Sequence, residues 1–457
     1  MNSSDHFDVL VIGGGPGGYR AAHLLAKRGF QTALAEKQAL GGMCLNCGCI
    51  PFKTYLHAVR ILRDAESLRA QSVLSGEALS LSQPSLFRQK EEIVSALRQG
   101  VQMTLDTCGV TVIRGEAHVI AASADCITIE VSGRQYTCKK LVLATGSRPA
   151  FVPQAPQGAA YSVADSRAML SLEKLPETVD VLGGGAIGLE AACFFAGAGC
   201  SVTVLEEAQH IGGCIDREIS DALSRILRKK GVRILTGARF ERADREAVLY
   251  RQGETVFART PQLLLCAAGR IPQFDAEELD LLGVRYTDAG IAIDAQCRTQ
   301  NPNVFACGDA TGKSMLAHTA YRQAKVIADV LGGRPARMDY TCIPRVLYTS
   351  PEVLRIGLTA QDCEAQGIDY QAHTLPMTYS GKYFAENGRD GAVAKMIVDA
   401  QKRVIGLQLI GNGAAELSLA AELMIRERMP ASEIEDLVFA HPSYSEIFGD
   451  LASSFNN

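Results

Sequence analysis

The sequence predicts an α/β protein in which one strand-helix-strand design occurs twice and is followed by a smaller α+β segment. Asp8–Ile12 is an apolar run typical of a buried strand, and it leads directly into the glycine-rich stretch 13–18. The same order recurs where Asp180–Leu182 leads into the glycine-rich stretch 183–188. Each stretch is followed by a helical pattern and a second apolar strand, so we expect two Rossmann-like units.

The first copy contains every part of such a unit, including an acidic residue at the end of the second strand. A helix is expected from Tyr19 to Arg28 and a second strand from Thr32 to Ala35, which ends at Glu36. In such a unit the glycines allow a tight turn, close approach of a pyrophosphate and close helix packing, and the acid accepts hydrogen bonds from ribose hydroxyls. The residues at these positions are Gly13, Gly15, Gly18 and Glu36.

The second copy repeats this pattern at the same spacing. A helix is expected from Leu189 to Ala198 and a strand from Ser201 to Leu205, and the closing acid is as far from the last glycine as in the first copy. A single glycine motif is a weak signal, but two complete copies predict that the chain binds two dinucleotides. The second set comprises Gly183, Gly185, Ala186, Ile187, Gly188 and Glu206.

Two further apolar runs, 141–149 and 304–310, end in small-residue turns. The second contains Asp309, whose carboxylate is suited to accept hydrogen bonds from the ribityl chain of a flavin. Together with the first glycine loop, both runs look like the FAD segments of two-dinucleotide flavoproteins. The second copy lies between them and therefore looks like an NAD module inserted into an FAD domain. The small residues of the first turn are Thr145, Gly146 and Ser147.

Composition argues against several other classes of protein. The chain has 457 residues, 47% of them hydrophobic, enough for two or three domains, and its net charge of −4 gives no positive field to attract nucleic acid or anionic lipid. Fourteen cysteines are mostly scattered, and the N-terminus has neither a basic start nor an apolar run. We therefore expect a reduced, cytoplasmic protein without a membrane span. A basic cluster is interpreted as the solvated face of a helix: Arg225, Arg228, Lys229 and Lys230.

The segment 41–53 carries two cysteines, Cys44 and Cys49, among glycine and proline. In a regular helix, residues five apart are too far apart to be bridged, so a disulfide here requires a distorted turn, for which Gly48 and Pro51 are suited. A strained disulfide in a loop is attacked more easily than a structural one, so we interpret the pair as redox-active. The alternative is that both thiols are reduced and pack as small hydrophobic side chains.

From Phe7 to about Ala452 the chain resembles the pyridine nucleotide-disulfide oxidoreductases, and among them the dihydrolipoamide dehydrogenases. The resemblance rests on Gly-Gly-x-Cys-Leu-Asn-x-Gly-Cys-Ile-Pro-x-Lys at 41–53, both glycine loops, 315–318, 348–352 and 440–446. It implies FAD and NAD as cofactors and a homodimer. The implied domains are an FAD domain at 1–148 and 273–339, an NAD domain at 149–272 and an α+β dimerisation domain at 340–457. Within the last of these, the apolar pattern predicts strands over 345–348, 392–399 and 404–410 and a helix over 414–426.

The resemblance also implies roles for side chains near the flavin. Cys44 attacks the substrate sulfur, and Cys49 lies against the flavin ring and forms a charge-transfer pair with it as a thiolate. Lys53 approaches the flavin and pairs with Glu190. The remaining FAD contacts are placed at the first glycine loop with its acid and at Gly115, Thr145, Gly146, Ser147, Asp309, Met315 and Ala317, and Gly269 joins the NAD set.

At the C-terminal end the resemblance implies an acid–base pair. His441 shuttles the proton of the substrate thiol, and Glu446 orients the ring and stabilises its cation. His318 matches a position whose backbone serves FAD, so it is given no role in proton transfer. We expect no metal site, because a zinc knuckle needs a second cysteine pair that is absent.

Four residues depart from the pattern of the family. Met43 stands where threonine is usual, Phe52 where serine is usual in lipoamide enzymes, and Tyr444 where leucine is common. The bulky ring of Phe52 is expected to narrow the site or to alter the surroundings of the flavin. Cys47, a third thiol between the catalytic two, is interpreted as a replacement for valine, with alternative disulfide pairing left open.

The function predicted from all this is oxidation of dihydrolipoamide, carried by an acyltransferase or carrier protein of a multienzyme complex, with NAD as acceptor. Neither nucleic acid nor a membrane is expected as a partner. One alternative is the same machinery acting as an NAD(P)H-dependent reductase of another low-molecular-weight disulfide. Another is a non-catalytic dinucleotide-binding subunit, which is disfavoured because such a subunit needs neither Cys44, Cys49 nor His441.

Overall fold

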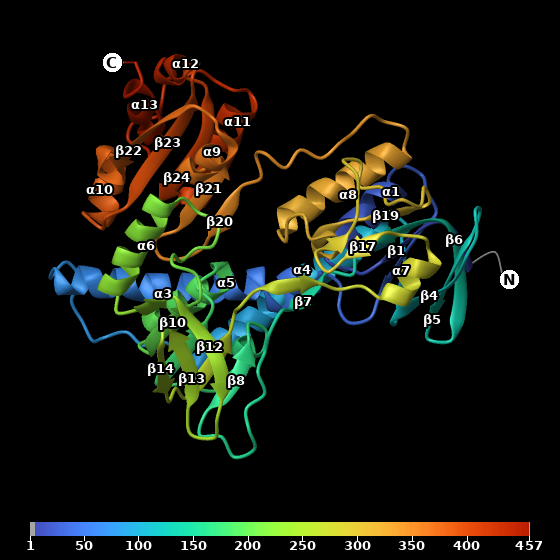
Figure 1. The fold of residues 1–457 in the computed structure, drawn as a ribbon, viewed down its shortest axis with the longest axis horizontal. Coiled ribbons are helices and arrows are strands. Elements are labelled where there is room, and N and C mark those ends of the chain that lie inside the picture. The colour runs from blue at the N-terminus through green and yellow to red at the C-terminus, as the bar shows by residue number, and fades with distance from the viewer. Residues whose placement is uncertain (1–4, 457) are drawn as a thin grey trace. The chain divides into compact units, whose positions relative to one another are not determined.

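The computed structural model describes residues 5–456, which fold into two compact units (Figure 1). The first holds the chain up to residue 54 together with 84–151 and 269–339, and the second holds 55–83, 152–268 and 340 onward. The predicted fold class, with two Rossmann-like parts and a C-terminal α+β part, is confirmed. The predicted domain boundaries stay a prediction.

The first unit is built on one sheet with the strand order β3-β2-β1-β6-β5-β4, in which β19 also pairs with β6. Residues 9–12 of strand β1 are all apolar, as expected of a parallel strand with both faces covered, and Val9, Leu10 and Val11 are fully buried. The strands are β1 (His6–Ile12), β2 (Thr32–Glu36), β3 (Thr111–Arg114), β4 (Ala117–Ala122), β5 (Ile127–Val131), β6 (Arg134–Leu143) and β19 (Val304–Ala306).

Helices α1 and α8 of the first unit pack side by side, and Arg28 at the end of α1 forms an ion pair with Asp329 on α8 (Figure 1). Strand β7 pairs with β16 in a short antiparallel ladder. The remaining elements are α1 (Pro16–Ala26), α2 (Gly42–Cys47), the start of α3 (Cys49–Ala70), α4 (Gln83–Thr107), β7 (Ser147–Pro149), β16 (Arg270–Pro272), α7 (Ala276–Leu281), β17 (Tyr286–Thr287), β18 (Gly290–Ile291) and α8 (Ala317–Leu331).

The second unit contains the second parallel sheet, in the order β11-β10-β9-β15-β8. A three-stranded antiparallel sheet, β12-β13-β14, is tied to it by Arg259, which donates hydrogen bonds to the buried Asp180 and to Thr203. The elements are β8 (Ser162–Asp165), β9 (Thr178–Leu182), α5 (Ala186–Gly197), β10 (Ser201–Glu206), α6 (Arg217–Lys229), β11 (Arg233–Thr236), β12 (Ala238–Ala243), β13 (Val248–Gln252), β14 (Thr255–Arg259) and β15 (Leu263–Cys266).

The C-terminal part of the second unit is an antiparallel sheet, β20-β21-β24-β23-β22, with helices packed on it. Strand β24 has the predicted bounds, and β23 begins one residue after its predicted start. The elements are β20 (Arg345–Leu347), β21 (Val353–Gly357), α9 (Ala360–Gln366), β22 (Tyr370–Pro376), α10 (Gly381–Asn387), β23 (Val393–Asp399), β24 (Val404–Ile410), α11 (Ser418–Arg426), α12 (Ala431–Glu435) and α13 (Glu446–Ser453).

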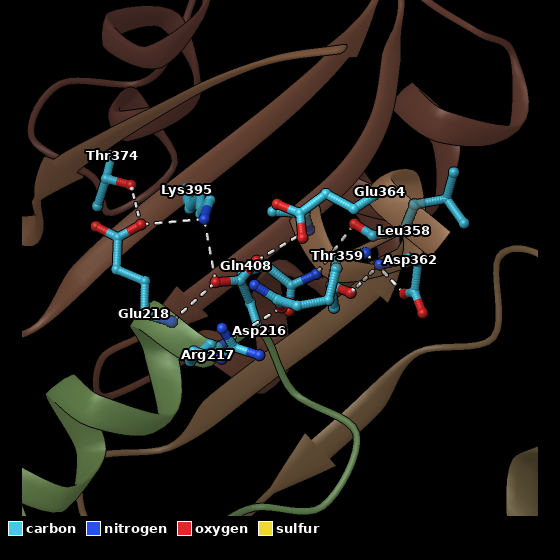
Figure 2. A network of polar contacts seen from close by, with 12 residues as sticks. Asp216, Arg217, Glu218, Leu358, Thr359, Asp362, Glu364, Thr374, Lys395 and Gln408 are labelled. Carbon is cyan, nitrogen blue, oxygen red and sulfur yellow. Dashed lines mark hydrogen bonds and ion pairs between the residues drawn. The ribbon is translucent and has the colours of Figure 1, made fainter. Parts of the chain in front are cut away.

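Within the second unit, helix α6 is fastened to the C-terminal sheet by a buried ion pair (Figure 2). Asp216 caps the start of α6 and is fully buried, and the Nζ atom of Lys395 on β23 lies 3.0 Å from its carboxylate. Glu218 contributes a second carboxylate 3.0 Å from the same nitrogen. The backbone N–H of Ala360, at the start of α9, also donates to Asp216. Three elements therefore meet at one carboxylate.

The interpretation of the basic cluster on α6 is wrong for one of its members. Arg225, Arg228 and Lys229 are exposed, but the Nζ atom of Lys230 donates a hydrogen bond to the backbone oxygen of Ser350 at 2.7 Å. Burial lowers the pKa of Lys230. Lys230 is the residue that follows the last residue of α6, so the helical pattern does not decide which way its side chain points.

Candidate functional site

The first glycine loop is held in shape by its glycines and by the carboxylate at the end of the second strand. Gly13 has a φ of +102°, and a Cβ atom on it would lie 2.3 Å from the backbone oxygen of Ala144, so only glycine fits. A Cβ on Gly18 would lie 1.7 Å from the backbone oxygen of Gly13. Because glycine has no Cβ, the start of α1 can pack closely against the loop that follows β1. The carboxylate of Glu36 accepts a hydrogen bond of 2.6 Å from the backbone N–H of Gly14. The loop is therefore held in shape at the N-terminus of a helix.

The second glycine loop has nearly the same geometry. Gly183 has a φ of +109°, and a Cβ on Gly188 would lie 1.9 Å from the backbone oxygen of Gly183. The backbone N–H of Gly184 donates to Glu206 at 2.6 Å, the same distance as in the first loop. The two copies that the sequence predicts thus have equivalent hydrogen bonds as well as equivalent residues.

Both loops fit a dinucleotide on their own geometry. Among residues 5–456, a Cβ on Gly185 would meet no atom within 4 Å, and one on Gly15 would meet only the Cα atom of Gly42, at 3.9 Å. These glycines precede α5 and α1, whose first N–H groups are directed toward an anion in this position. Open space in front of a helix N-terminus, next to a fixed carboxylate, is the arrangement that a pyrophosphate and its ribose require.

Two of the residues predicted to contact the flavin, Ser147 and Asp309, are hydrogen-bonded to each other in the first unit. The hydroxyl of Ser147 donates to the carboxylate of Asp309, and that of Thr145 donates to the backbone oxygen of Gln273. Arg270 was missed by the sequence analysis, yet its guanidinium donates to both the hydroxyl and the backbone oxygen of Ser147. Its partner Ser147 lies 123 residues earlier in the chain, so no local pattern of the sequence points to Arg270.

The other predicted contacts lie on turns and at a helix start. Gly115 has a φ of +141°, and its N–H donates to the backbone oxygen of Glu36 at 3.0 Å. Ala317 is the first residue of α8, and Met315 lies two residues before it. Gly269 has a φ of +98°, and its backbone oxygen accepts a hydrogen bond from Ala150. Gly146 has a φ of +79° and open space at its Cβ position.

The redox segment consists of two helices separated by one residue. Helix α2 ends at Cys47, α3 starts at Cys49, and Gly48 between them is not helical. In an unbroken helix the Cα atoms of Cys44 and Cys49 would be about 8 to 9 Å apart. Here they are 4.6 Å apart, and the two residues form a disulfide. A Cβ on Gly48 would lie 2.9 Å from the backbone oxygen of Met43, so the break requires glycine.

Pro51 fits the break expected of it. It is the third residue of α3 and lies in the first turn, where a proline costs no hydrogen bond. In one helix running from α2 into α3 it would be an interior residue without an N–H for the backbone oxygen of Cys47, so Pro51 and Gly48 both favour the break. Lys53 follows Cys49 by one turn of α3, so both lie on the same face of the helix.

Glu190, the predicted partner of Lys53, lies on α5 in the second unit. Its side chain is buried at 6% exposure and accepts a hydrogen bond of 3.1 Å from the backbone N–H of Tyr348. Glu190 thus has a defined orientation within its own unit. Its pairing with Lys53 stays a prediction.

His441 and Glu446 form the pair that the spacing predicts. The Nδ1 atom of His441 lies 2.8 Å from one carboxylate oxygen of Glu446, and the backbone N–H of Ser443 donates to the other at 2.7 Å. The Ser443 N–H and then the imidazole lower the pKa of Glu446. With Nδ1 bonded to a carboxylate, the Nε2 atom of His441 is left to exchange a proton. The imidazole is 79% exposed within its own chain.

The departures from the family pattern have local explanations in two cases. The ring of Tyr444 packs edge-on against Tyr383 at 5.2 Å between centroids, and its hydroxyl donates to Glu386. The Sγ atom of Cys47 lies 3.2 Å from the Sδ atom of Met43. Phe52 is 6% exposed, so its ring is buried rather than at the surface of the segment.

The chain belongs to the pyridine nucleotide-disulphide oxidoreductases. That family matches residues 7–324, and its dimerisation domain matches residues 343–452. Dihydrolipoyl dehydrogenase of Geobacillus stearothermophilus is 33% identical over 450 residues, which cover 97% of this chain and 95% of the relative. A dihydrolipoyl dehydrogenase of Bacillus subtilis (strain 168) is 34% identical over 454 residues and covers 97% and 95% in the same sense.

Solved structures show the same fold. The HOCl-induced flavoprotein disulfide reductase RclA from Escherichia coli, as its Cu(II) complex, matches with a TM-score of 0.84 at 29% identity, covering 97% of this chain and 99% of the other. LpdA from Mycobacterium tuberculosis matches with a TM-score of 0.86 at 22% identity, covering 98% and 99%. The fold therefore extends over nearly the whole chain.

These findings make the protein an oxidoreductase with FAD and NAD as cofactors and a disulfide as its redox-active group. The first glycine loop and the group around Asp309 are the residues that would hold FAD, and the second loop would hold NAD. The dimerisation domain supports a homodimer. Among the helices in residues 5–456, none has the length and apolar character needed to cross a bilayer.

Proposed function

We propose that the protein oxidises dihydrolipoamide, carried by a partner protein of a multienzyme complex, and reduces NAD. The observation that supports this best is the combination of the Cys44–Cys49 disulfide with the His441–Glu446 pair, since a dithiol substrate needs both a disulfide to exchange with and a base for its protons. Relatives named dihydrolipoyl dehydrogenase, which match nearly the full chain, point to the same substrate.

The reaction on the protein side is a pair of thiol–disulfide exchanges. One thiolate of the substrate attacks Sγ of Cys44, the bond to Cys49 breaks, and Cys49 leaves as a thiolate. The second substrate thiol then displaces Cys44, so lipoamide leaves and both cysteines are reduced. His441 accepts the thiol protons at Nε2, with Glu446 holding the ring. The chemistry that FAD supplies when bound is passage of the two electrons to NAD as a hydride.

The proposed site is shared between two chains. His441 is 79% exposed in its own chain, so its Nε2 atom is open to a partner. A two-fold interface is self-complementary and would create two equal sites, each with Cys44 and Cys49 from one protomer and His441 from the other. Lys53 is assigned to the flavin with Glu190 as its counter-charge. We also propose a cytoplasmic location, which is supported by the other cysteines of residues 5–456, since these form no disulfide.

The experiment that tests this proposal is a steady-state assay of the purified holoenzyme. Reduction of NAD is followed with dihydrolipoamide, reduced glutathione and other thiols as alternative donors. We expect kcat/KM for dihydrolipoamide to exceed that for every other thiol by about a hundredfold or more, the scale of discrimination that a fitted site provides. Equal or higher values with another thiol would refute the substrate assignment.

A second candidate function is the NAD(P)H-dependent reduction of another low-molecular-weight disulfide. It is favoured by the similarity to the flavoprotein disulfide reductase RclA, which spans nearly the full chain at 29% identity. The same assay run in reverse, with NADH and a panel of disulfides, distinguishes the two. Faster turnover with a disulfide other than lipoamide would favour this candidate.

A further inference from the structure

Two departures from the family pattern contact each other in the redox segment. The Sγ atom of Cys47 donates a hydrogen bond to the Sδ atom of Met43, with 3.2 Å between the sulfurs. Both residues lie on α2, and Cys44 lies between them on the same short helix. Three cysteines therefore occur within six residues, and one of them is not used by the reaction described above.

Cys47 is close enough to Cys44 for a disulfide between them. Residues three apart in an α-helix have Cα atoms about 5 Å apart, since three residues rise 4.5 Å and turn through about 300° on a cylinder of about 2.3 Å radius. Disulfides span Cα distances of about 4.4 to 6.8 Å. The observed Cys44–Cys49 distance of 4.6 Å is in the same range. Cys44 therefore has two partners within reach.

The backbone around Cys47 can adjust to the second pairing, while the start of the helix is held. Cys47 is the last residue of α2, and the next residue, Gly48, is outside the helix. Asn46 donates hydrogen bonds to the backbone oxygens of Leu40 and Gly42, and Arg98 on α4 donates to its side-chain oxygen. The pairing thus requires a rotation of the Cys47 side chain away from Met43 without loss of the helix.

We propose that Cys47 is a third redox-active thiol that exchanges into the disulfide. The thiolate of Cys47 attacks Sγ of Cys44, the Cys44–Cys49 bond breaks, a Cys44–Cys47 bond forms, and Cys49 leaves as a thiolate that takes up the proton given by Cys47. The exchange involves no net oxidation or reduction, so it needs no further reagent. It converts the catalytic Cys44–Cys49 pairing into a Cys44–Cys47 pairing, in which both cysteines of the disulfide belong to α2.

The exchange itself does not depend on the proposed function, but its effect on catalysis rests on that function. When Cys44 is paired with Cys47, the Cys44–Cys49 disulfide that the substrate reduces is absent. Met43 restrains the exchange. Its thioether accepts a hydrogen bond from the thiol, which stabilises the thiol form, and only the thiolate attacks. Replacing Met43 by leucine removes this acceptor at nearly constant volume.

The experiment locates the one thiol that remains in the oxidised segment. The oxidised holoenzyme is kept at pH 6 or pH 9 and quenched in acid, which removes the thiolate that exchange requires, and thiols are labelled with N-ethylmaleimide under denaturing conditions. Trypsin cleaves after Lys37 and Lys53 and leaves all three cysteines on one fragment. Fragment-ion mass spectra then show which cysteine carries the label. A label on Cys47 reports the Cys44–Cys49 pairing, and one on Cys49 reports the Cys44–Cys47 pairing.

We expect the Cys49-labelled form to make up about one tenth or more of the total, which corresponds to a pairing at most about 1.4 kcal/mol less stable than the other. Met43→Leu should increase this share, and Cys47→Ser should abolish it. Cys214→Ser, at an exposed cysteine outside the segment, is the control and should leave the share unchanged. A label on Cys47 alone, in the wild type and in Met43→Leu at both pH values, overturns the proposal. That result leaves the proposed function intact, since the latter depends on the donor assay.

Discussion

At the scale of single residues, the ring of His441 is held at Nδ1 by Glu446 and is open at Nε2. Changing His441→Gln removes the base for the substrate thiol, so turnover with dihydrolipoamide should fall about a hundredfold or more. Glu446→Ala should cost less, because the carboxylate orients the base without carrying the proton. Electron transfer from NADH to an external dye, which bypasses the thiol step, is the control measurement. An equal loss in both assays would contradict the assignment.

Glu206 leads to a prediction about coenzyme choice. Its carboxylate closes the second glycine loop and would repel the 2′-phosphate of NADP at close range. We expect kcat/KM to favour NAD over NADP by about a hundredfold. Glu206→Gln should reduce this ratio by about tenfold, whereas Glu207→Gln, at a side chain that is 72% exposed, should change it much less. Comparable efficiencies of the wild type with both coenzymes would refute the prediction.

At the scale of elements, the joint between α6 and β23 depends on Lys395. Burial by itself lowers the pKa of Lys395, but the charges and hydrogen bonds of Asp216 and Glu218 together outweigh burial, and the pKa lies above its usual value. Changing Lys395→Met leaves Asp216 buried without its counter-charge and should lower the free energy of unfolding by about 3 to 5 kcal/mol. Lys174→Met, at an exposed lysine, is the control. The free energy of unfolding of both variants is measured by thermal or denaturant unfolding. An equal loss in the two variants would show that the Lys395–Asp216 pair contributes nothing specific to stability.

Much of this element structure could be predicted from the sequence, and the failures have physical causes. The glycine loops were predictable because glycine positions and a closing acid specify one local geometry. The helix expected over 414–426 starts instead as a 3-10 turn, Ala414–Leu417, where the backbone N–H of Ala415 donates to Glu352 on a distant segment. The half-buried position of Lys230 likewise depends on Ser350, far along the chain. Local patterns carry no information about such distant partners.

At the scale of the whole molecule, the shared site can be tested by mixing two inactive chains. In a heterodimer of a Cys44→Ser chain and a His441→Gln chain, one site carries both changes and the other carries neither. If each site uses both protomers, about half of the wild-type activity per heterodimer should return. Activity is measured on heterodimers isolated with two different affinity tags. No recovery would mean that each chain builds its site from its own residues.

The hydrogen bond between each glycine loop and its carboxylate also affects how the nucleotides bind. In each, a carboxylate at the end of the second strand accepts a hydrogen bond from a backbone N–H of the loop, so the protein's own groups hold the curved shape of the loop. A nucleotide therefore meets a preorganised receptor and does not have to pay the entropic cost of ordering it. Replacing Glu36 or Glu206 should therefore mainly increase the dissociation rate of the nucleotide bound at that loop, because a less rigid loop holds the nucleotide less firmly.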